Sequence, residues 1–354
     1  MDEEERTVYY AREFSMGGNS IMSSDFLTEE LEAQVLKDVE NGSFLIRNEQ
    51  CVNAYAYREE QQNIVAISLG SIYKCLYTAN LFMLKDDFIP EAGEGNACYS
   101  SVSPREFPLS DEGGEMSFYE SGDEERRNIG HIIAALALKF MVYHEIGHHV
   151  CGHLERLNGE LGLDHGEAQA ESCSNLTAEE FQKLETEADL HSVEKILKEL
   201  DELCEKWSPY FEVEIGHLEL VQLLTYALVI VKENLGAEAD PIETMETGRY
   251  LPKLIRVVIG ISTALLGDSE ELMDSFRLLI ESDPVTVESI ESYIGPFSID
   301  NELEMMKALN VYLAISLTNA EQTYADIFYG RHDPIVFQPE ILIAEWWERR
   351  SQQT

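Results

Sequence analysis

The sequence predicts an α+β protein in which a small β-containing N-terminal half precedes a mostly helical half. Three short apolar runs lie between residues 44 and 69, and almost everything after Ile132 has the apolar spacing of helices. With 354 residues, 44% of them hydrophobic, the chain can bury a substantial core as one large domain or two modest ones. We expect an acidic lead-in over residues 1–25, a core over 26–215 and a helical region over 216–354.

The N-terminal elements are separated by residues that favour turns. A helix is predicted from Thr28, which can cap it, to Val39, and Asn41-Gly42 ends it. The next expected elements are strands at 44–47, 52–57 and 64–69, followed by a helix at 72–84.

A long segment without regular pattern separates these elements from the helical half. Residues 85–127 are rich in Gly, Pro, Ser and acidic residues, which indicates a surface loop. A loop of this length in a compact domain is often functional, so it is a candidate lid over a cleft. Helices are then predicted at 129–153, 178–204, 216–235, 250–266, 268–281, 300–319 and 340–350, with breaks at Asp240-Pro241, Asp283-Pro284 and Asp333-Pro334.

The charge balance limits the classes of partner. The chain has 25 basic and 67 acidic residues, a formal net charge of −42. A field of this sign repels nucleic-acid phosphates and anionic membranes, so neither is an expected partner. Two interpretations stay open, attraction of a basic substrate and simple high solubility.

The cysteines and apolar runs predict a cytoplasmic protein. The six cysteines are scattered without a CxxC pair, which is unlike a disulfide scaffold, and the acidic N-terminus has no apolar signal region. Each of the longest apolar runs is shorter than the roughly 20 residues that a membrane span needs. We therefore expect buried core helices and no membrane span.

The residues 143–148, YHEIGH, contain an HExxH pattern. Helix positions four apart share one face, so His144 and His148 can present imidazole nitrogens to a single metal ion. Glu145 lies about 100° further round, where its carboxylate can act as general base on a metal-bound water. Because three fixed positions also occur by chance, the motif needs independent support.

That support comes from the residues 185–189, ETEAD, on a helix that Thr177 and Glu180 can open as a capping box. Two histidines and Glu185 leave the fourth position of a zinc ion open, as catalysis requires. Asp189, four residues on, can accept the outer N–H of a ligand histidine, whereas Glu187 should point elsewhere. The competing interpretation is a solvated acidic helix face.

Other histidines give weaker candidates. His149 and His153 are also four apart, but no glutamate lies between them, so we expect His149 behind the ligands or on the surface and His153 in a capping or packing role. The metzincin pattern needs glycine and histidine where this chain has Cys151 and Leu154, which excludes that class. The remaining histidines before the last are expected to be structural or exposed: His131, His165, His191 and His217.

Taken together, HEIGHHVCGH and ETEAD resemble the HExxH…ExxAD pattern of the gluzincin zinc metallopeptidases, which include HtpX and the CAAX-type proteases. The residues 53–57, NAYAY, with the following apolar strand and helix, are similar to the NAfA strand region of that family. The three motifs occur in the family's order over residues 50–195. Because no membrane span is expected, the chain is more similar to soluble relatives such as the phage-exclusion Lit-type peptidases.

The resemblance implies a zincin-like core with a small mixed β-sheet and an active-site helix. It also implies one catalytic Zn²⁺ on His144, His148 and Glu185, and a protein or peptide substrate that is held by strand addition. The substrate would pair with the edge strand at Asn53, Ala54, Tyr55 and Ala56.

A C-terminal residue often lies near the oxyanion in gluzincins. His332, in the turn-like segment 329–334, is the candidate here for a catalytic role of this kind, and an ordinary surface histidine is the competing interpretation.

The predicted function is that of a zinc endopeptidase, by analogy a regulated protease in phage defence or stress response. One alternative is a zincin-fold sensor or scaffold that binds zinc and a protein partner with little or no proteolysis. Another is a structural helical protein with a chance HExxH. The sequence indicates neither the substrate nor the oligomeric state.

Overall fold

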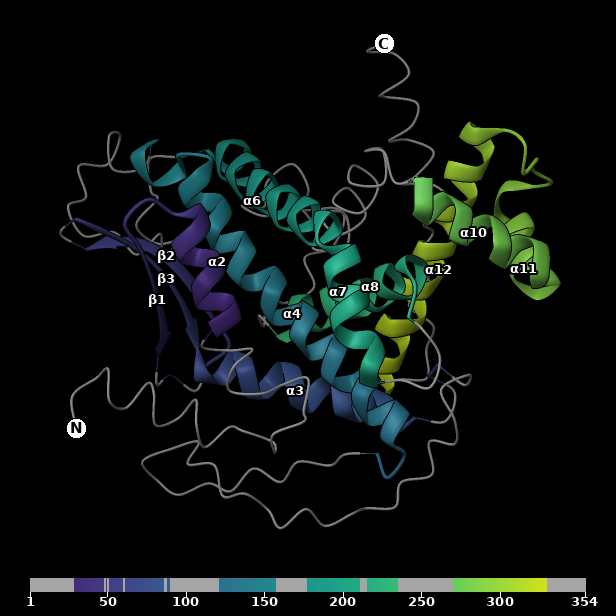
Figure 1. The fold of residues 1–354 in the computed structure, drawn as a ribbon, viewed down its shortest axis with the longest axis horizontal. Helices are drawn as coiled ribbons and strands as arrows, with labels where there is room; N and C mark the ends of the chain where they lie inside the picture. Colours follow the sequence, from purple (N-terminus) through teal and green to yellow (C-terminus); the bar gives the residue numbers. More distant parts are fainter. Residues whose placement is uncertain are drawn as a thin grey trace.

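The computed structural model describes residues 29–47, 49, 51–59, 61–85, 88–89, 121–156, 177–210, 215–234 and 270–329. Helices form most of these residues, and three strands form one small sheet at one side of the molecule (Figure 1). This combination agrees with the predicted α+β class. The predicted lead-in, most of the predicted loop at 85–127 and the predicted helices at 250–266 and 340–350 lie outside the described residues.

The sheet is mixed, with β3 (Gln62–Ser68) between β1 (Gly42–Arg47) and β2 (Ala54–Glu59). β1 runs parallel to β3 and β2 runs antiparallel to it. Val65 and Ile67 of β3 are fully buried in the hydrophobic core, which continues into the helices. The three strands lie within two residues of the strands predicted at 44–47, 52–57 and 64–69.

The turn into β1 requires its Asn-Gly pair. Asn41 has a φ of 51°, in the left-handed region that asparagine tolerates. A Cβ on Gly42 would lie 2.8 Å from the carbonyl oxygen of Val39, so no larger residue fits there. The predicted end of the first helix at this pair is confirmed.

One helix precedes the sheet in the chain, and the other described helices follow it. The helices are α2 (Leu31–Asp38), α3 (Leu69–Met83), α4 (Glu124–Val150), α6 (Ala178–Lys198), α7 (Leu200–Trp207), α8 (His217–Asn234), α10 (Glu270–Ser282), α11 (Pro284–Ile294) and α12 (Glu302–Tyr329), with a short 3-10 turn at Ser208–Tyr210. The predicted cap Thr28 lies outside the described residues, and α2 begins after Glu30 without a side-chain cap.

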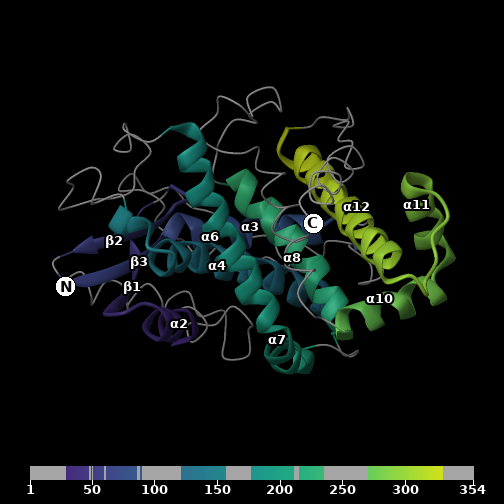
Figure 2. The ribbon, with the colours of Figure 1, turned by 90° about the horizontal axis from the view of Figure 1, so that it is seen from above.

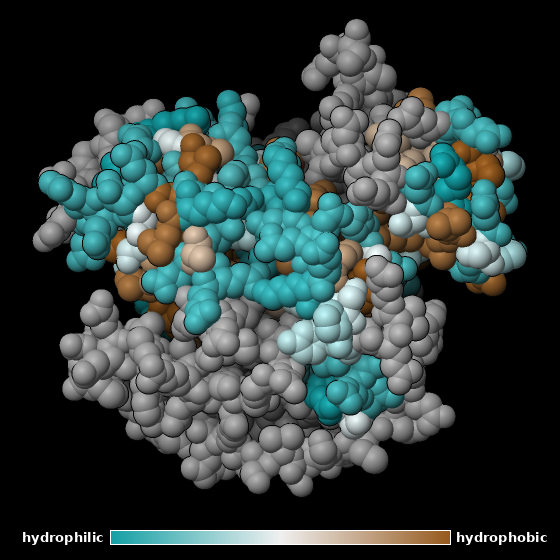
Figure 3. Space-filling model, viewed as in Figure 1, coloured by the Kyte–Doolittle hydropathy of each residue, from teal (hydrophilic) through white to brown (hydrophobic). Residues whose placement is uncertain are grey.

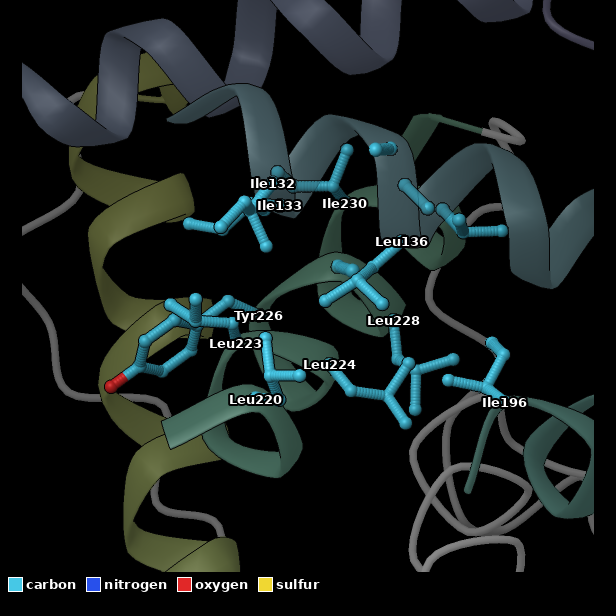
Figure 4. Close-up of a cluster of buried hydrophobic side chains, with 14 of the residues drawn as sticks. Ile132, Ile133, Leu136, Ile196, Leu220, Leu223, Leu224, Tyr226, Leu228 and Ile230 are labelled. Carbon is cyan, nitrogen blue, oxygen red and sulfur yellow. The ribbon is translucent and has the colours of Figure 1, made fainter. Parts of the chain in front are cut away.

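Helix α4 lies at the centre of the molecule, as Figures 1 and 2 show from two directions. It packs against α3, α6 and α8 and against strands β2 and β3. Figure 4 shows part of the resulting core, where Ile132, Ile133 and Leu136 of α4 lie near apolar side chains of α8 and Ile196 of α6. This burial fixes the axis of the helix that carries HExxH.

Among the helices of the described residues, α4 alone is long and apolar enough to cross a membrane. In the structure 83% of its most apolar window is buried by the rest of the chain, as in the core helix of a globular protein.

The start of α4 corrects the predicted loop boundary at residue 127. Residues 124–127 belong to the helix, because the Asp123 side chain accepts a hydrogen bond from the backbone N–H of Arg126 at 3.1 Å. Arg126 is fully buried, and its guanidinium donates to backbone carbonyls that include those of Met83, Lys85 and Phe88. The end of α3 is thereby fastened to the start of α4.

The helix predicted at 300–319 extends to Tyr329 as α12, and two other boundaries differ from prediction for identifiable reasons. The helix predicted at 178–204 is interrupted at Glu199, whose carboxylate binds Lys139 and Tyr143 of α4 at 3.1 and 2.7 Å. Asp283-Pro284 begins α11 instead of only breaking the chain, because Asp283 caps the helix and Pro284 occupies its first turn.

The visible surface is mainly hydrophilic over α6 and α7 but has apolar atoms over α10 and α11 (Figure 3). Large exposed apolar side chains there include Leu278, 67% exposed, and Val285, 71% exposed.

Candidate metal centre

Helix α4 places His144 and His148 one turn apart, with their Nε2 atoms 3.1 Å from each other. In Glu185 of α6, Oε2 lies 3.5 Å from the Nε2 of His144 and Oε1 lies 3.5 Å from the Nε2 of His148. The three ligand atoms all lie within 4.8 Å of one another, so one ion can contact them together. Two imidazole nitrogens and a carboxylate oxygen suit zinc and leave a coordination position open.

The two helices meet because small residues face each other at the crossing. A Cβ added to Gly147 of α4 would lie 3.0 Å from the Cα of Ala188 and 3.2 Å from its carbonyl oxygen. Ala188 is fully buried. Because the two helices approach so closely, the side chain of Glu185 can reach both histidines from the neighbouring helix. The predicted capping box of Thr177 and Glu180, which starts α6, is present.

The outer nitrogen of His144 has a carboxylate acceptor. Its Nδ1 lies 2.8 Å from Oδ1 of Asp189, which is only 5% exposed. When Nδ1 carries the proton, it donates to Asp189 and Nε2 is free to bind a metal. The structure thus brings Asp189 to the atom that the sequence analysis named for it.

The outer nitrogen of His148 has a different neighbour, His153, in a contact that the sequence did not predict. Its Nδ1 lies 2.8 Å from Nδ1 of His153, and the Nε2 of His153 lies 3.0 Å from Oε2 of Glu187. His153 therefore contacts a ligand histidine and is fully buried, beyond the capping or packing role expected for it. Glu187 points away from the ligand atoms, as expected, but towards this histidine.

No simple sequence periodicity indicates the contact between His148 and His153. The helix ends at Val150, and Gly152 has a φ of 69°, a left-handed conformation that turns the chain back towards the site. The Gly-His pair directly after the helix is the available signal.

Burial sets the proton affinity of Glu145. The residue is 9% exposed, and burial raises the pKa of its carboxyl to about 7, with Glu185 and Asp189 adding to the rise and His144 opposing it. A carboxyl with a pKa near neutrality can take up and release a proton readily.

The two ligand histidines are affected in opposite directions. Burial disfavours the charge of His144, but hydrogen bonds with Asp189 and Glu185 outweigh it and raise its pKa to about 10. Burial lowers the pKa of His148 to about 3, although Glu185 opposes the change. At neutral pH the pair thus carries one positive charge beside the facing carboxylates, and a bound metal cation can replace that charge.

The predicted substrate strand is held in place at its first residues. The backbone N–H of Asn53 donates to the hydroxyls of Ser68 and Ser71 at 3.1 and 2.9 Å, and its side-chain oxygen accepts from the N–H of Ala54. Within the described residues β2 pairs with β3 alone, so its other edge has no strand beside it there.

The side chains of β2 alternate between two environments. Ala56 is 4% exposed, and Ala54 packs against the core. The Tyr55 hydroxyl binds Glu49, and its ring lies 4.5 Å from the guanidinium carbon of Arg47.

The sheet is attached to the C-terminal end of α4, next to the candidate ligands. His149 donates from Nε2 to the carbonyl oxygen of Ile64 at 3.0 Å, and Arg58 forms an ion pair with Glu155. His149 therefore links α4 to β3 and does not contact the ligand set in the described structure. His332 lies outside the described residues.

A family model described as Peptidase U49 matches residues 56–232, which is half of the chain. The chain belongs to the peptidase U49 family. The match begins within β2, at Ala56, and covers β3, α4 and α6, so it includes His144, His148 and Glu185. Searches of curated proteins and of solved structures find no significant match.

Membership of this Lit-like family makes the protein a peptidase, a hydrolase whose substrate is a protein or peptide. The His-His-Glu cluster is consistent with a metallopeptidase. The family match supports the predicted resemblance to Lit-type peptidases. The resemblance to HtpX and the CAAX-type proteases stays a prediction.

Proposed function

We propose that this peptidase is a zinc-dependent endopeptidase of the gluzincin type with a zincin-like core. The observation that carries the proposal is the convergence of His144, His148 and Glu185 from two helices, next to the buried carboxyl of Glu145. The Peptidase U49 match over the same helices supports a hydrolytic role for this cluster.

The donor set fits zinc, with His144, His148 and Glu185 as the residues that would hold it. When bound, zinc supplies a water of lowered pKa and a Lewis-acid contact for the scissile carbonyl. Asp189 orients the ring of His144 through the 2.8 Å contact at Nδ1.

Glu145 is the proposed general base. Its carboxylate takes the proton of the attacking water and then delivers it to the nitrogen of the leaving amine. The buried position supports this role, because a pKa near 7 allows both uptake and release of the proton.

The edge strand β2 is the proposed substrate-binding element. A peptide in extended conformation would add to the edge at Asn53, Ala54, Tyr55 and Ala56, which has no strand beside it among the described residues, and backbone hydrogen bonds would give affinity. The hydrogen bonds that hold Asn53 to Ser68 and Ser71 pre-order this edge.

His332 is proposed to stabilise the oxyanion.

By analogy with Lit-type peptidases, we propose a cytoplasmic protease with one protein target in phage defence or stress response. The net charge of −42 favours a basic substrate, in which case added salt would slow cleavage.

The test is the zinc content and activity of three purified proteins: wild type, Glu145→Gln and Glu185→Ala. Mass spectrometry should find near one zinc in wild type and in Glu145→Gln and little in Glu185→Ala. Cleavage of a cell-derived peptide library should fall at least about 100-fold in Glu145→Gln, because the general base is lost while the metal stays.

Three outcomes would count against the proposal in different ways. Absence of zinc from wild type, even after zinc is supplied, would remove the metal centre. Zinc binding together with cleavage that Glu145→Gln does not reduce would remove the assigned base. A zinc-loaded wild type without any cleavage would favour the sensor or scaffold alternative.

A further inference from the structure

The two ligand histidines are supported in different ways. His144 contacts the carboxylate of Asp189 directly, whereas His148 reaches the carboxylate of Glu187 only through His153. We propose that His153 and Glu187 are positioning residues that fix the ring orientation and tautomer of His148 for metal binding. The inference rests on the proposed metal centre and deepens it.

The proton positions along this chain of groups follow from what each atom can accept. An ionised Glu187 can only accept hydrogen bonds, so Nε2 of His153 donates to it. A neutral His153 then has an unprotonated Nδ1, which accepts a hydrogen bond from Nδ1–H of His148. His148 is left with a free lone pair on Nε2, the atom that faces His144 and Glu185.

Burial makes His148 depend on His153 for a hydrogen-bond partner at Nδ1. His153 is fully buried and His148 is 8% exposed, so water is largely excluded from the contact between them. Without an acceptor at Nδ1, His148 would gain by moving its proton to Nε2, where it blocks the ligand lone pair. His153 is thus placed to oppose the tautomer that cannot bind a metal.

Two basic side chains also lie beside Glu187. Arg156 and Lys183 lie 3.6 and 3.9 Å from its carboxylate oxygens. The carboxylate that contacts His153 therefore also has basic partners.

The distances separate this role from direct ligation by His153. His148 presents Nε2 to His144 and Glu185, so its contact with His153 is made by the other ring nitrogen. The Nδ1 atoms of His148 and His153 are 2.8 Å apart, as in a hydrogen bond. The only other ring nitrogen of His153 is directed at Glu187.

The experiment measures zinc affinity by competition with a chelator in the full-length protein. The variants are His153→Phe, which removes both polar contacts, His153→Gln, which retains an acceptor and a donor, and Glu187→Gln, which removes the charge. His149→Gln is the matched control, because His149 is on the same segment but binds the backbone of Ile64.

We expect His153→Phe to weaken zinc binding about 10–100-fold, with partial rescue in His153→Gln and a loss of at least about threefold in Glu187→Gln. His149→Gln should bind zinc as wild type does. The absorption spectrum of the cobalt-substituted protein should change in His153→Phe and not in His149→Gln, a readout that a purely structural role would not move.

Wild-type zinc affinity in both His153→Phe and Glu187→Gln would overturn the positioning role of His153 and Glu187 while leaving the metal centre intact. Absence of zinc binding in wild type would instead overturn the metal centre and this positioning role with it. Urea unfolding of the metal-free variants identifies a folding defect, and in that case Glu187→Gln and His153→Gln decide the question.

Discussion

At the scale of single residues, the three acids of the ETEAD segment have three different tasks. Glu185 faces the two ligand nitrogens, Asp189 binds His144, and Glu187 binds His153. Positions 185 and 189 share a helix face, whereas position 187 is about 200° further round. Glu187 still contributes because the chain after α4 turns at Gly152 and returns His153 to α6.

The direct contact between Asp189 and His144 can be tested by Asp189→Asn. The amide retains an acceptor but loses the charge, so we expect zinc affinity to fall about 10–100-fold. Chelator competition measures the change. Glu194→Gln, on the same helix but with an exposed side chain paired to Lys198, is the control. Equal zinc affinity in the two variants would show that the charge of Asp189 does not support the ligand.

At the scale of secondary structure, the proposed metal centre depends on how closely α4 and α6 approach. Gly147→Ala adds a methyl group 3.0 Å from the backbone of Ala188, which cannot rotate away. The better helix propensity of alanine gives at most about 1 kcal/mol, whereas overpacking costs about 1–3 kcal/mol. We therefore expect net destabilisation and weaker zinc binding, because Glu185 moves away with α6.

Gly130→Ala in the same helix is the matched control for this prediction. There the added methyl group would meet the side chains of Asn80 at 3.0 Å and Met83 at 3.2 Å, and side chains can adjust. Thermal unfolding and chelator competition should both separate the two variants. If Gly147→Ala binds zinc as tightly as Gly130→Ala does, the close approach is not needed to place Glu185.

The sequence predicted those elements whose signals are local. The HExxH helix, the capping box at Thr177 and the three strands all have a periodicity or cap that can be recognised in a short window. The interruption at Glu199 has no glycine or proline, because its cause is a tertiary contact with Lys139 and Tyr143. The contacts that join His148 to Glu187 through His153 depend on a left-handed turn at Gly152, which periodicity does not describe.

At the scale of the whole molecule, a buried network of charges joins the first described helix to the helices of the site. Lys139 of α4 is 3% exposed at its side chain and lies 2.7 Å from Glu30 and 3.1 Å from Glu199. Glu30 also pairs with Lys206 of α7, and Lys195 of α6 lies 2.9 Å from Asp38 of α2. The network is adjacent to Tyr143, the residue before His144, so it holds α2 against the segment that carries the ligands.

This network predicts a specific pH dependence of stability. Burial opposes ionisation of Glu30, but Lys139 and Lys206 outweigh it and hold the pKa below its usual value of 4.5. The unfolded chain therefore binds a proton at Glu30 more readily than the folded chain does. The stabilisation is fully present above pH 4.5 and is lost as the pH falls from there through the lower folded pKa.

Comparing wild type with Glu30→Gln isolates this contribution from the other acidic residues. At neutral pH the variant should lose about 1–3 kcal/mol of unfolding free energy, because buried Lys139 loses one of its carboxylates. The difference should shrink as the pH falls below 4.5, where wild type also becomes protonated at this position. Urea unfolding followed by tryptophan fluorescence measures it, with Glu32→Gln on the exposed face of α2 as control. A difference between wild type and Glu30→Gln that stays constant through acid pH would assign the loss to packing and not to charge.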